Sequence, residues 1–307
     1  MPDTRDPAAP AAVGDAAAGG RLRNYLALLR AHQWIKNVFV LAPLFFTPDA
    51  LSVAMALHVL LGAACFCAVS SAVYIVNDFV DREADRRHPR KRHRPLAAGT
   101  ISTVEAFLAF SVLVLIGVGG AWLLAPPFAA LLVAYFALNL AYSLKLKHLS
   151  IVDLLSISAG FVLRVDGGAM LIGVPPSEWI LLCTGLLALF IAIGKRRDDL
   201  VKDLGTEHRP SLEGYTTTFL DIAATMVLGA LLVSYAIYTT DAAVMARLGS
   251  ERLYLTVPFV LAGVLRYVQI IVVEERSGSP TTVVLTDRFM IVTVLGWMAT
   301  FAVLIYG

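Results

Sequence analysis

The segment NDFVDREADRRHPRKRHRPLAAG, residues 77–99, determines how the rest of the chain is interpreted. It carries four acidic and seven basic side chains and directly follows a long apolar run. Asp78, Asp81 and Asp85 recur at positions i, i+3 and i+7, which lie on one face of a helix. The segment therefore predicts a helix that leaves a membrane with three carboxylates on one face and Asn77 beside them.

Composition also assigns the chain to the membrane class. Of its 307 residues 58% are hydrophobic, whereas about 45–50% is usual for a soluble domain. The net charge of +2 gives no reason to expect a nucleic-acid partner. The three cysteines lie in apolar runs without metal or disulfide spacing, so we interpret them as small hydrophobic residues.

Nine apolar stretches are long enough to cross a bilayer, which predicts an all-α integral membrane bundle of about nine helices. They cover residues 25–46, 51–76, 102–124, 127–143, 151–173, 178–195, 217–240, 253–273 and 287–305. The first stretch is interrupted by Trp34, Lys36 and Asn37 and should kink at Pro43. Such a polar break is tolerated where a helix lines a cavity inside the protein.

The loops between these stretches alternate in charge. Those after the second, fourth, sixth and eighth stretches are charged, and most of the others are short and nearly uncharged. The positive-inside rule places the charged loops in the cytoplasm. Residues 1–20 have no periodicity and predict a disordered cytoplasmic tail, which leaves residues 21–307 as a single membrane domain.

A second charged helix end, KRRDDLVKD at residues 195–203, occurs four spans after the first. The recurrence suggests a pseudo-symmetric bundle in which both clusters face one central cavity. Adjacent carboxylates repel one another unless a cation lies between them, and Mg²⁺ prefers hard oxygen ligands and keeps places for substrate phosphate. We therefore predict a site for Mg²⁺ and a diphosphate. The alternative is a solvated acidic face paired with Arg82, Arg86 and Arg87.

Isolated cations inside the apolar stretches fit the same chemistry. Lys36 is predicted to bind a phosphate, with snorkelling to the interface as the alternative. Arg164 lies about twelve residues into the fifth stretch, and it should pair with Asp166, another acid or a ligand phosphate. For Lys147, at the end of the fourth stretch, substrate contact and a topological role are equally open.

With these residues in place, the chain resembles the UbiA superfamily of intramembrane transferases. The pattern NDxxDxxxD from Asn77, followed by KRHRPLAAG at 91–99, is similar to the superfamily signature. QWIKN at 33–37 and GKR at 194–196 resemble the branch that transfers phosphoribose to polyprenyl phosphates. The resemblance covers about residues 21–305, and it leaves the roles of three acids unassigned: Asp166, Asp198 and Asp203.

The resemblance implies nine helices around a central cavity that binds a Mg²⁺-diphosphate between two Asp-rich motifs. It implies an enzyme, a pentosyltransferase that moves 5-phosphoribose from 5-phosphoribosyl 1-diphosphate (PRPP) to a polyprenyl phosphate such as decaprenyl phosphate. The product would serve cell-envelope arabinan synthesis. The implied catalytic metal ligands are Asp78, Asp81, Asp85 and Asp199. The implied substrate-binding residues are Lys36, Asn77, Arg94, Tyr142, Lys147, Arg164, Lys195 and Arg196.

The same resemblance implies a bacterial inner-membrane protein whose site faces the cytoplasm, and it leaves a homo-oligomer open. One alternative is a UbiA-type prenyltransferase that moves a prenyl chain from its diphosphate to an aromatic or lipid acceptor. Lys36 and Arg164 favour phosphoribose, because a prenyl carbocation needs aromatic and apolar surroundings. The other alternative is a polyprenyl-phosphate carrier without catalysis, which would not need two sets of carboxylates.

Overall fold

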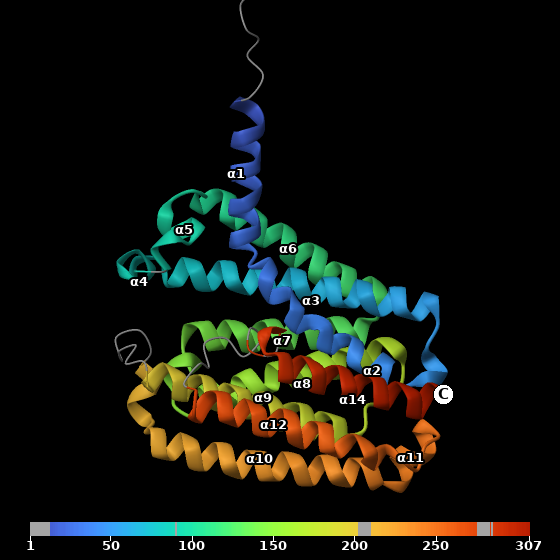
Figure 1. Ribbon diagram of the computed structural model, residues 1–307. Helices are drawn as coiled ribbons and strands as arrows, with labels where there is room; N and C mark the ends of the chain where they lie inside the picture. The colour runs from blue at the N-terminus through green and yellow to red at the C-terminus, as the bar shows by residue number, and fades with distance from the viewer. Residues whose placement is uncertain (1–12, 90, 202–209, 275–282, 284) are drawn as a thin grey trace, which may run out of the picture.

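The computed structural model describes residues 13–89, 91–201, 210–274, 283 and 285–307 (Figure 1). Within these residues, eight helical segments are long and apolar enough to cross a membrane. They are α3 (Val53–Val80), α6 (Thr103–Leu124), α7 (Pro126–Leu144), α8 (Val152–Ile172), α9 (Glu178–Val201), α10 (Thr217–Thr240), the continuous segment of η7 (Leu253–Thr256) and α12 (Val257–Val272), and α14 (Arg288–Tyr306). The prediction of an all-α membrane bundle is confirmed.

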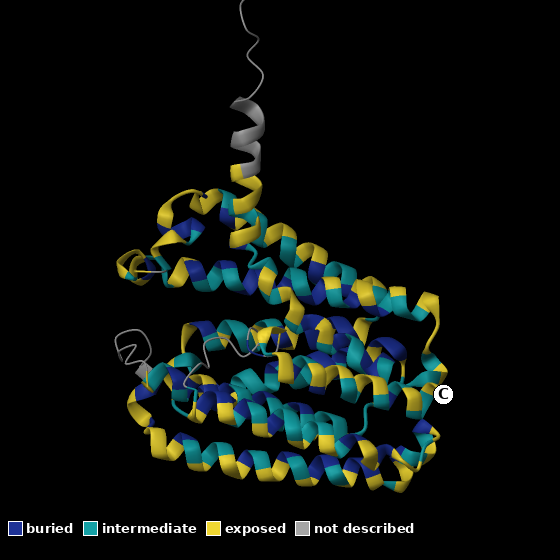
Figure 2. Cartoon of the chain, in the orientation of Figure 1, coloured by how far each residue is buried: buried dark blue, intermediate teal, exposed yellow. Residues whose placement is uncertain are grey.

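The spans pack in layers around α8. Helix α8 contacts α7 and α9, α3 packs on α6 and α7, and α10 packs on α9. Figure 1 shows α3 and α6 on one side of the bundle and α10 on the other. Figure 2 shows exposed residues along α6 and α10, and large apolar residues such as Leu115 and Met226 are among them, as expected of helices that face lipid. In its most apolar stretch α3 is 56% buried and α6 only 11%, so α3 is a central helix.

The predicted first span, 25–46, crosses the bundle in a different form. Helix α1 (Val13–Leu28) covers only the first residues of this stretch, and Arg30 then adopts a left-handed backbone conformation with φ 50°. The chain continues as the 3-10 helix η1 (Ala31–Leu41) and the short helix α2 (Ala42–Phe45). Together these two elements rise about 28 Å, which is close to the ~30 Å thickness of a hydrocarbon core. The first crossing is thus mainly a 3-10 helix.

A triplet spacing in the sequence explains this form. In a 3-10 helix the residues at i and i+3 eclipse one another, so positions 34, 37 and 40 form one line. Trp34 donates a hydrogen bond to Ser71 of α3, and Asn37 and Val40 are buried. The inward line of η1 therefore fits between α3 and α8, and these contacts override the preference for an α-helix.

Gly168 of α8 permits the close approach of η1. A Cβ atom at this position would lie 2.0 Å from the carbonyl oxygen of Val40. No side chain can be accommodated there unless the two backbones separate.

Of the loops that were predicted to share one side of the membrane, the described segments next to α3 and α10 lie at one end of the bundle. Helices α4 (Arg82–Arg87) and α5 (Pro95–Ala98) and the start of α10 are at the left in Figure 1. Helix α11 (Ala242–Leu248) and the C-terminus lie at the opposite end. The first part of the predicted N-terminal tail, residues 1–12, lies outside the described residues, and α1 is described from Val13.

We expect Gly168→Ala to lower the melting temperature of the purified protein in detergent, because the added methyl group must push the Val40 carbonyl away. Overpacking of this kind costs about 1–3 kcal/mol. Circular dichroism during heating measures the effect.

Gly229→Ala in α10 is the matched control, because a Cβ atom there would meet nothing within 4 Å. This change should leave the melting temperature unchanged or raise it slightly, since alanine favours a helix more than glycine. Equal melting temperatures for the two variants would contradict the close packing of η1 on α8.

Candidate functional site

The first acidic motif lies where α3 ends and α4 begins. Asp78 belongs to the last turn of α3, Asp81 joins the two helices, and Asp85 lies in α4. Asp78 and Asp85 are each 2% exposed, whereas the side chain of Asp81 is 29% exposed. Asn77 is half-buried beside them. Two of the three carboxylates are therefore buried and require cationic partners.

Those partners come from other elements of the chain. Arg94 Nη1 lies 3.1 Å from Asp78 Oδ1 and 2.7 Å from Asp85 Oδ2. Arg30 also pairs with Asp78 and stacks on the ring of Tyr74. Lys147, in the 3-10 helix η4 (Leu146–His148), places its Nζ 2.7 Å from Asp81 Oδ1. Three carboxylates are thus balanced by three cations.

Two of the three arginines that were considered as alternative partners, Arg82 and Arg86, bind elsewhere. Arg86 pairs with Glu83, and Arg82 donates to the hydroxyl of Thr103. The acidic motif is therefore an inward-facing group tied to distant segments, and a solvated face paired with its own helix does not describe it.

The carboxylates of this motif suit a divalent cation. Arg94 Nη1 already lies between two carboxylate oxygens, which marks a position where positive charge is favourable. In the arrangement described, no group of three or more His, Cys, Asp or Glu side chains is drawn together around one point. A metal would replace the guanidinium between Asp78 and Asp85, and Arg94 would then be available to an anion.

The second motif, on α9, is arranged differently. Arg196 is 1% exposed and places its Nε 2.7 Å from Oδ2 of Asp153, which is fully buried. Its Nη1 lies 3.7 Å from Asp199 Oδ2, and its Nη2 lies 3.4 Å from the hydroxyl of Tyr142. Asp198 is 6% exposed, and Asp203 lies outside the described residues. Arg196 is therefore neutralised by an acid that the sequence did not single out.

Arg164 lies deep in α8 and has only neutral partners. Its Nε donates to Asn37 Oδ1 at 2.8 Å, its Nη1 to the Gly160 carbonyl and its Nη2 to the Tyr135 hydroxyl, both at 2.7 Å. The guanidinium also lies over the rings of Tyr135 and Phe161. Within the described residues it forms no ion pair, and Asp166 is two positions away, which places it on another face. Among the described residues Arg164 is thus a buried cation without a counter-ion.

Two lysines reinforce this positive region. Lys36 of η1 is half-buried and lies within electrostatic range of Arg164, Lys195 and Arg30. No hydrogen bond or ion pair of Lys36 occurs in the part of the chain that the structure describes. Cations from η1, α8 and α9 therefore converge, as expected of a site that holds an anion.

The connection between α7 and α8 joins the two motifs. At the end of α7, Tyr142 contacts Arg196 of the second motif. Five residues later, Lys147 binds Asp81 of the first. Tyr142 and Lys147 therefore link the second motif to the first at the charged end, whereas Arg164 lies deeper in the bundle.

Sequence reasoning missed the roles of three residues: Arg30, Tyr135 and Asp153. A signal was available for Asp153, because a carboxylate within an apolar stretch indicates a functional or paired group. Nothing local distinguished Arg30 from an ordinary basic residue at the end of a helix, or Tyr135 from an ordinary core tyrosine. Their roles depend on contacts between segments that are far apart in sequence.

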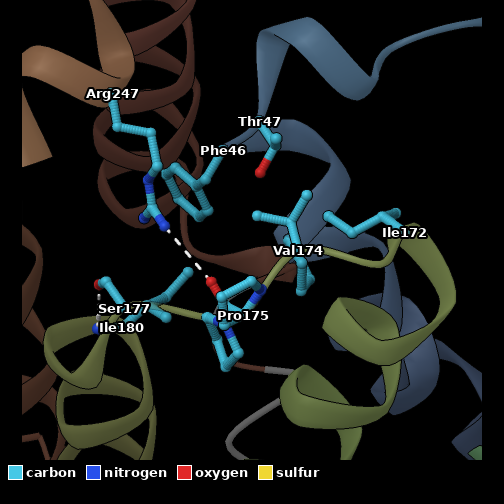
Figure 3. A pocket seen from close by; sticks show the side chains of 10 residues that line it. Phe46, Thr47, Ile172, Val174, Pro175, Ser177, Ile180 and Arg247 are labelled. Atoms are coloured by element: carbon cyan, nitrogen blue, oxygen red, sulfur yellow. Dashed lines mark hydrogen bonds between the residues drawn. The ribbon is translucent and has the colours of Figure 1, made fainter.

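A small pocket at the opposite end of the bundle offers no comparable chemistry. It has a volume of about 10 Å³, enough for a single water. Figure 3 shows Phe46, Val174 and Pro175 among its lining residues, with Arg247 donating to the Pro175 carbonyl at 3.5 Å. The candidate site is therefore the charged end.

Known proteins resemble the chain over nearly its whole length. The family model described as "UbiA prenyltransferase family" matches residues 37–293. A decaprenyl-phosphate phosphoribosyltransferase of Mycobacterium tuberculosis is 36% identical over 281 residues, 89% of this chain and 91% of that protein. Its namesake from Corynebacterium glutamicum is 35% identical over 291 residues, 91% of this chain and 85% of the other. A solved UbiA homolog from Archaeoglobus fulgidus bound to GPP and Mg²⁺ has a TM-score of 0.70 at 20% identity, covering 92% of this chain and 100% of that one.

The different surroundings of the two buried arginines predict effects on stability of different size. Arg196→Gln should lower the free energy of unfolding by about 3–5 kcal/mol, because it leaves Asp153 charged, buried and unpaired. Arg164→Gln should change it by only about 1 kcal/mol, because lost hydrogen bonds are offset by removal of an uncompensated charge. Thermal unfolding in one detergent measures both variants. Equal losses would show that Arg164 has a counter-ion within the protein.

Proposed function

The chain belongs to the UbiA prenyltransferase family, and we propose that it transfers 5-phosphoribose from PRPP to a polyprenyl phosphate, releasing diphosphate. The observation that carries the proposal is the pair Lys36 and Arg164, buried or half-buried cations without a carboxylate partner among the described residues. The names of the relatives that align with about nine-tenths of the chain support the same reaction.

The number of cations supports phosphoribose over a prenyl donor. The proposed reaction brings three anionic groups together: the diphosphate and 5-phosphate of the donor and the phosphate of the lipid. One set of cations surrounds the first acidic motif, and it consists of Arg30, Arg94 and Lys147. A second set consists of Lys36 of η1, Arg164 deep in α8 and the exposed Lys195 of α9. A prenyl diphosphate would need only the first set, whereas both sets are needed for phosphates at two ends of a substrate pair.

We assign a magnesium ion to Asp78, Asp81 and Asp85, with Asp199 of α9 as a further ligand. The solved homolog bound to GPP and Mg²⁺ supports the use of a divalent metal in this fold. When bound, Mg²⁺ would neutralise the charge that develops on the departing diphosphate. Arg94 and Lys147, released from their carboxylates, would then contact the diphosphate oxygens.

The chemistry requires few groups beyond these cations. An oxygen of the lipid phosphate forms a bond to C1 of the ribose, the bond from C1 to the diphosphate breaks, and its electron pair leaves with the diphosphate. The attacking phosphate is already an anion, so no strong general base is required. A single displacement inverts the configuration at C1. Lys36 and Arg164 would orient the two substrates by binding phosphates at the deeper end.

The location of the charges suggests how the substrates enter. PRPP is soluble and highly anionic, so we propose that the charged end of the bundle faces the cytoplasm. The acceptor is a lipid and would enter from the bilayer between the spans. The phosphoribosylated lipid would then supply the assembly of cell-envelope arabinan.

Purified protein in nanodiscs with Mg²⁺, PRPP and decaprenyl phosphate is expected to release one diphosphate for each phosphoribosyl lipid formed. A coupled diphosphate assay and lipid mass spectrometry measure the two products. The comparison reaction contains geranylgeranyl diphosphate and 4-hydroxybenzoate. Consumption of only the prenyl diphosphate would identify a prenyltransferase, and binding of lipid phosphate without turnover would identify a carrier.

Asp81→Asn should reduce kcat by about 100-fold or more. The substitution removes one of the carboxylates proposed to bind the Mg²⁺ ion that neutralises the departing diphosphate. The melting temperature of the variant should stay close to that of the wild type, since the Asp81–Lys147 pair is partly exposed and such pairs contribute about 0–1 kcal/mol. Asp221→Asn removes an ion pair with Arg197 on the outside of the bundle and is the control. Full turnover by Asp81→Asn at saturating Mg²⁺ would remove Asp81 from the metal site.

A further inference from the structure

Asp153 is the most enclosed carboxylate near the second motif. It lies in the first turn of α8 and is 0% exposed. Its Oδ2 accepts hydrogen bonds from Arg196 Nε at 2.7 Å and Ser211 Oγ at 3.2 Å, and its Oδ1 accepts one from the Tyr215 hydroxyl at 2.6 Å. Three donors from two segments of the chain, α9 and residues 211–215, hold one carboxylate in a fixed orientation.

The backbone beside Asp153 is strained. Ile151 has φ 69° and ψ −49°, a conformation that β-branched residues rarely adopt. The Val152 N–H donates to the Ser150 carbonyl at 2.8 Å, which closes a γ-turn with Ile151 at its centre. The Ile151 N–H donates to the Tyr215 hydroxyl, the same group that donates to Asp153. Such conformations persist where the surrounding contacts enforce them, and they concentrate at functional sites.

Tyr215 acts in this network as a donor. Burial, together with its hydrogen bond to Asp153, raises the pKa of Tyr215, so the hydroxyl keeps its proton near neutral pH. The Ile151 N–H donates to the Tyr215 hydroxyl, and this hydroxyl donates to Asp153. The strained turn, Tyr215 and Asp153 are therefore joined in one hydrogen-bonded unit.

This unit fixes the guanidinium of Arg196. The guanidinium is planar, so holding Nε against Asp153 also determines where Nη1 lies. Nη1 is buried and has no hydrogen-bond partner in the described part of the chain, but it lies 3.7 Å from Asp199 Oδ2. A small displacement of Asp199 would close this contact to a hydrogen bond. Arg196 thus lies between Asp153, whose carboxylate is held by three donors, and Asp199, whose side chain is 15% exposed.

We propose that Asp153 is a positioning residue that acts through Arg196 to hold Asp199 in place for the metal-bound donor. The inference rests on the proposed function, because it assigns Asp199 to the metal. In this role Asp153 does not contact the substrate. It fixes the guanidinium of Arg196, and Arg196 in turn positions the carboxylate of Asp199. Arg164 provides the contrast, because it has no acid and stays available to a phosphate.

The test measures Mn²⁺ binding by electron paramagnetic resonance in nanodiscs, with and without PRPP. Asp153→Asn should weaken Mn²⁺ binding in the presence of PRPP by about 10-fold or more, as is typical when a residue behind a metal ligand is removed. Asp221→Asn, which breaks the exposed pair of the neighbouring Arg197, should bind Mn²⁺ like the wild type.

A double variant separates positioning from stability. Asp153→Asn leaves Arg196 buried without its acid, so it should also lower the melting temperature. Adding Arg196→Gln removes both buried charges and should recover much of that loss, while Mn²⁺ binding stays weak because Asp199 has no guanidinium beside it. If Mn²⁺ binding recovers together with the melting temperature, Asp153 stabilises the fold only and the proposal is overturned.

Tyr215→Phe keeps the charges of Asp153 and Arg196. It is the alternative test variant if Asp153→Asn does not fold. It should weaken Mn²⁺ binding several-fold, because the carboxylate loses one of the donors that orient it. Unchanged binding in this variant would also overturn the proposal. Absence of Mn²⁺ and PRPP binding by the wild type would instead overturn the proposed function, and with it the role of Asp199.

Discussion

Charge placed inside a lipid bilayer must be balanced within the protein or by a ligand, and this constraint organises the charged end of the bundle. Three arginines illustrate it. Arg94 is shared between two carboxylates, Arg196 is matched by Asp153, and Arg164 has only neutral partners. Their surroundings imply different chemistry. A metal can replace Arg94 between its two carboxylates. Arg196 is held in place by its ion pair with Asp153. Arg164, whose partners among the described residues are neutral, can bind an anion.

Helix length determines where this charge can be placed. Helix α3 has 28 residues and α9 has 24. At 1.5 Å per residue they are about 42 Å and 36 Å long, and both exceed the ~30 Å of a hydrocarbon core. The two acidic motifs occupy the excess turns at one end, where water and counter-ions reduce the cost of charge. By contrast, Arg164 lies near the middle of the 21-residue α8, and only hydrogen bonds and aromatic rings surround it.

The apolar stretches predicted eight spans to within a few residues, because hydropathy over about 20 residues depends little on tertiary contacts. The first crossing is mainly a 3-10 helix because its line of Trp34, Asn37 and Val40 fits against α3 and α8. The triplet spacing is in the sequence, but the tertiary contacts that select it over an α-helix are not. The spacing of Asp78, Asp81 and Asp85 predicted a common face. It did not predict that their cations come from Arg30, Arg94 and Lys147, because these contacts span between 9 and 66 positions in sequence.

The neutral surroundings of Arg164 have a consequence for binding. A guanidinium has five N–H donors, and the three contacts to Asn37, Gly160 and Tyr135 fix its plane while leaving donors on Nη1 and Nη2. A carboxylate in their place would fix the plane equally well but would cancel the charge. Asn37 and Tyr135 are themselves held by Cys67 and Ser70, so the cation is orientated before any substrate arrives. A phosphate that binds there gains the full interaction with a charge already in place, and this gain is unavailable to a substrate that carries no second phosphate.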